Sequence, residues 1–275
     1  MTIAARRRVY WALFLMACLC IAAFVPLYAN LVRMPAEPDF LAGSGALGRF
    51  ELLGIALPSP RLAGAGAGLC SLYAVATLGM ILYSFRKTVS AEIYFYAFWV
   101  LSVGMESLRL VVFGLAATRA SPEWQSLATR VLLFARYAGQ LSFLASSLHA
   151  AGFRNEKLGT AAALVLALAT ALAVAMPVNT GSYAPSLELR PGYADLHLAF
   201  YLVASLATVA DFIYAERSTG ERSFRLVAIG SAACLLGRQL LVTQWNPFAL
   251  VAGFALLATG SWLLVSRLHG YYLWQ

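Results

Sequence analysis

The chain has 275 residues, of which 61% are hydrophobic and 12% are charged, and its formal net charge is +8. Soluble domains carry about 25% charged and about 45–50% apolar residues, so this composition excludes a water-soluble globular protein. The basic residues lie beside apolar segments, where they act as topology signals, and we therefore expect membrane lipids and no nucleic acid as partners.

Eight apolar segments, separated by short polar stretches, follow one another along the chain. A helix of about 20 apolar residues crosses roughly 30 Å of hydrocarbon, so each segment predicts one membrane span. The sequence thus predicts an all-α integral membrane protein, an eight-transmembrane-helix bundle. The predicted spans are residues 9–32, 64–85, 92–115, 127–153, 158–178, 193–214, 224–242 and 247–268.

Basic residues mark alternate ends of these spans. If the N-terminus lies inside, the external loops hold far fewer basic residues than the internal ones. This distribution follows the positive-inside rule, so we expect a bacterial inner (cytoplasmic) membrane and two cytoplasmic termini. A signal cleaved before Cys18 is the alternative, although the apolar run continues past that residue. The internal basic residues would be Arg6, Arg7, Arg8, Arg86, Lys87, Arg154, Lys157, Arg217, Arg222, Arg225 and Arg267.

The chain also matches itself at an offset of 128 or 129 residues. Paired polar residues in the same order favour a tandem repeat over chance similarity between apolar segments. We therefore predict two four-helix halves, residues 1–157 and 158–275, related by a pseudo-twofold axis along the membrane normal. Only the first half has a long external loop, about residues 33–63. At an offset of 128, four residues of the second span match four of the sixth: Tyr73, Val75, Ala76 and Leu78 with Tyr201, Val203, Ala204 and Leu206. At an offset of 129, four residues of the third span match four of the seventh: Glu92, Phe95, Ser102 and Arg109 with Glu221, Phe224, Ser231 and Arg238.

Three predicted spans carry arginine inside the membrane, where one charge costs about 2.5–3.5 kcal/mol. The helical rise puts Arg109, Arg136 and Arg238 at a similar depth, roughly 4–9 Å to the external side of the midplane. Glu106 is the one carboxylate that we expect at this depth. The predicted cluster therefore carries about two uncompensated positive charges, which call for an anion or an aqueous cavity.

These residues predict an outward-facing, arginine-rich site that binds an anionic amphiphile or a small anion, in a transporter-like or sensory protein. In the structural alternative, Glu106 pairs with Arg109 or Arg238, Arg136 extends toward the external headgroups, and Gln140 bonds a neighbouring helix. The predicted ligand-binding residues are Arg109, Arg136, Arg238, Glu106, Gln140 and Gln239.

Two other classes of function are open. A membrane enzyme could hold a lipid-linked, phosphate-containing substrate on the arginines and use His197 or Glu106 as acid or base. A subunit or sensor module of a membrane complex would bind a membrane-protein partner or a second copy of the chain. His197 lies at the external rim of the predicted bundle. Near it are the external loop at residues 179–191 and the rim residues Asp195, Gln244, Trp245 and Asn246. Trp124, Tyr183, Tyr193 and Trp245 are interpreted as interfacial anchors.

Metal and cofactor sites find little support in the sequence. His149 and His269 recur in a Ser-x-Leu-His pattern near the internal face, but two ligands are too few for a metal or haem site. The four cysteines lie within predicted spans. We therefore expect neither a metal site nor a cofactor.

Overall fold

The structure is a computed structural model that describes residues 3–33, 60–85, 90–153, 158–184, 186–243 and 247–273. Eight helices among these residues are long and apolar enough to cross a membrane, so the chain is a multi-pass integral membrane protein. Residues 34–59 of the expected external loop lie outside the described residues, as do Gln244, Trp245 and Asn246. The helices are α1 (Ile3–Arg33), α3 (Pro60–Ser84), α4 (Ala91–Gly104), the 3₁₀ turn η1 (Met105–Ser107), α5 (Leu108–Ala117), α6 (Pro122–Ala150), α7 (Leu158–Ala175), α8 (Ala194–Thr219), α9 (Ser223–Thr243) and α10 (Pro247–Leu273).

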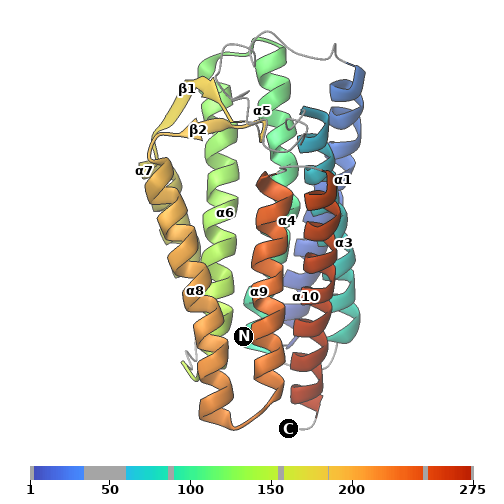
Figure 1. Ribbon diagram of the computed structural model, residues 1–275, viewed down its shortest axis with the longest axis vertical. Helices are drawn as coiled ribbons and strands as arrows, with labels where there is room; N and C mark the ends of the chain where they lie inside the picture. The colour runs from blue at the N-terminus through green and yellow to red at the C-terminus, as the bar shows by residue number, and fades with distance from the viewer. Residues whose placement is uncertain are drawn as a thin grey trace.

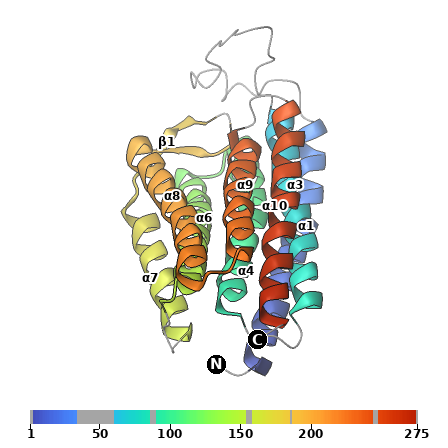
Figure 2. The same ribbon diagram turned by 60° about the horizontal axis from the view of Figure 1, so that its bottom comes forward.

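The helices stand side by side along the long axis of the molecule (Figure 1). The helix α4 is central, packing on α3, α6 and α1, and nearly all of its side chains are buried. Helices α7 and α8 flank α6 on one side, and α1 and α3 lie on the other. Both described ends of the chain lie at one end of the bundle, which we call the terminal end (Figure 2).

A short β-hairpin covers the opposite end, which we call the hairpin end (Figure 1). It consists of β1 (Val178–Tyr183) and β2 (Leu189–Pro191), paired antiparallel with a register shift between Asn179 and Tyr183. The sequence predicted a loop here, whereas the structure has two paired strands. The interpretation of Tyr183 as an interfacial anchor was wrong, because Tyr183 is buried and its hydroxyl donates to the side-chain oxygen of Gln125. Burial raises the pKa of Tyr183, so this hydroxyl remains a donor.

The two halves of the chain pack their outer helices differently. Helix α1 lies along α3 of its own half, whereas α7 lies along α6 of the first half. The tandem relation of the halves stays a prediction.

The fourth predicted span was placed too late, because α6 begins at Pro122. Proline fits the first turn of a helix, where the backbone N–H groups make no intrahelical hydrogen bond and the N–H that proline lacks is not needed.

Glycines bring α9 and α10 into backbone contact. Gly230 and Gly237, two turns apart on α9, face Gly260 and Gly253 on α10. A Cβ atom on Gly237 would lie 2.6 Å from the Gly253 carbonyl oxygen, and one on Gly230 would lie 2.8 Å from the Gly260 carbonyl oxygen. Small residues of this kind let membrane helices approach closely, where van der Waals packing replaces the hydrophobic effect. This contact fixes α9, which carries Arg238, against α10.

We expect Gly237→Ala to destabilise the protein, because its new methyl group meets rigid backbone. Overpacking of this kind costs about 1–3 kcal/mol, and thermal unfolding in detergent would measure it. Gly159→Ala on α7 is the matched control, since nothing lies within 4 Å of a Cβ added there. Equal melting temperatures for the two variants would contradict the close α9–α10 contact.

Candidate anion-binding site

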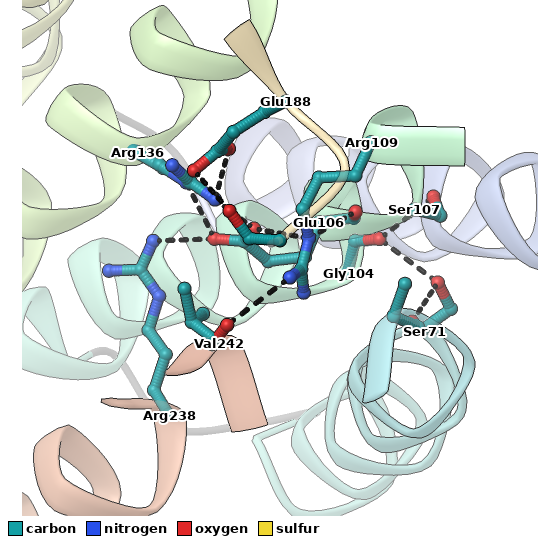
Figure 3. Close-up of polar contacts among 11 residues, drawn as sticks. Ser71, Gly104, Glu106, Ser107, Arg109, Arg136, Glu188, Arg238 and Val242 are labelled. Atoms are coloured by element: carbon teal, nitrogen blue, oxygen red, sulfur yellow. Dashed lines mark hydrogen bonds and ion pairs between the residues drawn. The ribbon is translucent and has the colours of Figure 1, made fainter. Parts of the chain in front are cut away.

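A 3₁₀ turn within the third membrane span positions Glu106. The helix α4 tightens into the turn η1 before α5 begins, so the backbone hydrogen bonds there span three residues instead of four. The hydroxyls of Ser71 and Ser107 donate to the Gly104 carbonyl oxygen at 3.0 and 3.1 Å. The turn is therefore satisfied within the bundle, and it directs the Glu106 side chain toward α6 and α9 (Figure 3).

Three arginines from three helices converge on the Glu106 carboxylate, which is completely buried (Figure 3). Arg136 on α6 donates twice, from Nε to Oε1 at 3.0 Å and from Nη2 to Oε2 at 2.7 Å. Arg238 on α9 donates from Nη2 to Oε1 at 3.0 Å. Arg109 on α5 places Nε 3.2 Å from Oε2. The hydrogen bond of this Nε goes to the Glu106 backbone carbonyl oxygen, also at 3.2 Å. One carboxylate thus links α6 and α9 through charge-assisted hydrogen bonds and α5 through an ion pair.

A second carboxylate reaches this cluster from the β-hairpin. Glu188 Oε2 lies 2.8 Å from Nη2 of Arg136, and Glu188 is buried. Sequence reasoning missed Glu188 because it counted only residues inside spans, although Glu188 is the sole acidic residue of the loop at 179–191. The expected excess of two positive charges was therefore wrong: among the described residues of the cluster, three arginines face two glutamates, which leaves an excess of one.

Not every donor in the cluster has an acceptor. Nη2 of Arg109 and Nε of Arg238 are buried and make no hydrogen bond with any described residue. The guanidinium carbon of Arg238 lies 5.4 Å from the centroid of the Tyr201 ring, a cation–π contact that stabilises the charge. Buried guanidinium donors without partners are costly, so these groups are suited to an additional acceptor.

A cavity of about 140 Å³ lies beside the cluster, between α6, α8, α9 and the hairpin. Its mouth lies between α8 and α9, where Leu198 and Gln239 are exposed. Helices α8 and α9 meet at the terminal end and diverge toward the hairpin end (Figure 1). The exposed Leu198 and Gln239 in its wall indicate that the cavity reaches the surface of the bundle at this side. Its wall consists of Glu106, Arg136, Glu188, His197, Leu198, Tyr201, Arg238, Gln239 and Val242.

Four of the six expected ligand-binding residues line this cavity: Glu106, Arg136, Arg238 and Gln239. The other two do not. Arg109 lies behind Glu106, where its Nη1 donates to the Val242 carbonyl oxygen at 3.5 Å. Gln140 donates to the Ser205 hydroxyl of α8 at 3.2 Å, as the structural alternative expected. That alternative was wrong for Arg136, which is buried and bonded to Glu106.

His197, a candidate acid or base in the sequence, also lies at this cavity. Its ring lines the cavity, and its Nδ1 shares a 2.9 Å hydrogen bond with the hydroxyl of Tyr137. This bond fixes the ring beside Arg136 and Arg238. For metals, no group of three or more His, Cys, Asp or Glu residues gathers within the described part of the chain.

Comparisons with protein-family models, with curated proteins and with solved structures found no match for this chain.

We expect Glu106→Gln to destabilise the protein by about 3–5 kcal/mol, because it leaves three buried arginines facing a neutral amide. Chemical unfolding in mixed micelles would measure the loss. Glu123→Gln, at an exposed position in the first turn of α6, is the control and should change little. If both variants unfolded alike, Glu106 would not be the charged centre of the bundle.

Proposed function

We propose that the chain binds an anionic amphiphile, with the headgroup in the cavity beside Arg136 and Arg238, as a transporter-like or sensory protein. The observation that carries this proposal is the excess positive charge beside a cavity, together with a buried Arg238 Nε that has no acceptor among the described residues. Arginine forks bind phosphate and carboxylate through paired hydrogen bonds. An anion there would balance the cluster.

The mouth of the cavity favours an amphiphile over a fully soluble anion. Leu198, Leu202 and Leu206 form an exposed stripe on α8 at helical spacing, starting at the mouth and running toward the terminal end. In a membrane this stripe contacts acyl chains. A headgroup in the cavity and chains along the stripe would therefore match the polar and apolar surfaces of one molecule.

The structural interpretation of the arginines remains the main competitor. It assigns the whole cluster to fixing α5, α6 and α9 together, which the bonds to Glu106 achieve. Ion pairing explains two of the three positive charges, and a charge without a partner in a membrane costs about 2.5–3.5 kcal/mol. A bound anion accounts for the third charge, which pairing alone leaves unexplained.

A membrane enzyme is the second candidate, and His197 is the observation that favours it. The ring lies in the wall of the same cavity, held by Tyr137, so a phosphate on the arginines would be near an acid or base. An enzyme would convert a lipid-linked substrate, and His197→Gln would stop product formation while binding continued. A pure binding protein would release its ligand unchanged.

We further propose that the hairpin end faces the outside of a bacterial inner membrane and the terminal end faces the cytoplasm. Support comes from the basic residues Arg217, Arg222 and Arg225, which flank the α8–α9 connection at the terminal end. Lys and Arg residues in short loops between membrane spans are enriched on the cytoplasmic side. The cavity would then be accessible from the outer leaflet.

A tandem origin of the two halves is also part of the proposal. Arg109 and Arg238 match at the repeat offset, and both contact Glu106 from opposite halves of the chain. Helix α6 packs on α8, and α10 packs on α3, as an exchange of the halves would require. The different positions of α1 and α7 mark where the symmetry has been lost.

We expect Arg238→Gln to weaken binding of short-chain phosphatidylglycerol by about tenfold or more, since a hydrogen bond to a charged group contributes about 1.5–3 kcal/mol. Isothermal titration in detergent would measure the affinity, with short-chain phosphatidylcholine as the zwitterionic comparison. Arg225→Gln is the control, because that arginine is exposed and pairs with Glu216 on the surface. Equal affinities for all three proteins would refute a site at Arg238.

A further inference from the structure

We propose that Glu188 is an internal, exchangeable ligand of Arg136, that a phosphomonoester headgroup takes its place, and that the turn of the β-hairpin loosens when this happens. The inference rests on the proposed function, because it concerns the same cavity. It adds the chemical class of the anion and a response of the protein to its binding.

Glu188 is the least well held charge in the cluster. Its Oε2 lies 2.8 Å from Nη2 of Arg136, and the same nitrogen donates to Glu106 at 2.7 Å. The geometry leaves Glu188 Oε2 without a hydrogen bond to any described residue. Two carboxylates at one guanidinium nitrogen also repel each other in a region of low dielectric. Glu188 is thus attracted by charge but poorly fixed by hydrogen bonds.

The backbone beside Glu188 is strained. Leu187 has a φ of 67°, a left-handed conformation that is unfavourable for a residue with a branched side chain. The Ala184 amide donates to the Glu188 carbonyl oxygen at 2.8 Å, and Leu187 is buried under this turn. Strained backbone persists where surrounding contacts over-determine it, and it concentrates at ligand clamps and switch regions. Releasing Glu188 from Arg136 would let the turn relax.

Apolar side chains hold the strands of the hairpin on the bundle, whereas Glu188 is held by polar contacts alone. Ser186 donates to Glu188 Oε1 at 2.9 Å, so the second oxygen of the carboxylate is held only from within the hairpin. Tyr183 pairs with Leu189 beside the turn, so its contact with Gln125 holds this end of the hairpin strands against α6. Loss of the Arg136 pair would therefore free Glu188 and the turn that carries it, while Tyr183 keeps the strands in place.

Charge balance identifies the class of anion. Without Glu188, three arginines face Glu106 alone, which leaves two positive charges. A phosphomonoester carries about −1.5 to −2 near pH 7 and offers three acceptor oxygens, whereas a phosphodiester or a carboxylate carries a single negative charge. The phosphate oxygens would accept hydrogen bonds from Arg136, once Glu188 has left it, and from the Nε of Arg238 that has no acceptor among the described residues. A phosphomonoester therefore gains most from displacing Glu188.

Hydrogen–deuterium exchange of the purified full chain tests the displacement. We expect short-chain phosphatidic acid to accelerate exchange of the amides in the turn of the hairpin, residues 184–188, by about tenfold or more. Short-chain phosphatidylglycerol should do so less at equal occupancy, because its charge is lower. Inorganic phosphate separates the two sources of the same chemistry: loosening of the turn by phosphate alone would support a free phosphate in the role of the lipid headgroup.

Glu188→Gln provides a second readout. Removing the competing carboxylate should tighten binding of short-chain phosphatidic acid by about tenfold, whereas Glu123→Gln, exposed at the start of α6, should leave the affinity unchanged. Unchanged affinity in Glu188→Gln together with unchanged hairpin exchange on binding would overturn this inference while leaving the proposed function intact. If neither the wild type nor Glu188→Gln bound any of the probes, the proposed function would fail, and the inference with it.

Discussion

The burial of one carboxylate among three guanidinium groups is the constraint on which the rest of the structure depends. Desolvating Glu106 is costly, and the attraction of the arginines offsets that cost only because their hydrogen bonds are well aligned. Alignment in turn requires the 3₁₀ turn that directs Glu106 and the glycine contact that fixes α9 against α10. Local backbone geometry and helix packing thus both keep the arginines aligned with Glu106.

The same constraint explains why the cluster is suited to binding. A centre built only for stability would balance its charges, as a buried ion pair does, and would leave no donor without an acceptor. Here the described residues leave one positive charge in excess, and Nε of Arg238 lacks a partner beside a cavity. In the proposed function, the mouth between α8 and α9 would bring lipid headgroups within reach of that charge. Glu188 would then be a partial substitute for the anion, at the expense of strain at Leu187.

Much of this arrangement could be predicted from the sequence, because membrane spans and helical depth follow from residue counts. Apolar runs of about 20 residues gave the eight spans, and the helical rise brought Arg109, Arg136 and Arg238 to one depth, where they share Glu106. Rotation about a helix axis was not predictable, since packing decides it, and so the sequence did not indicate that Arg109 and Gln140 lie outside the wall of the cavity. Glu188 was missed because its position depends on a hairpin that folds back onto α6, a tertiary contact without a periodic signal.

The most direct test of the central claim is mass spectrometry of the lipids and small molecules that the gently purified wild-type protein retains, compared with folded Arg238→Gln protein. We expect a single anionic amphiphile, retained in a stoichiometric amount by the wild type and lost from the variant. Identical profiles from the two proteins, without a stoichiometric anion in either, would contradict an anion site at Arg238 and assign the arginines to holding the bundle together.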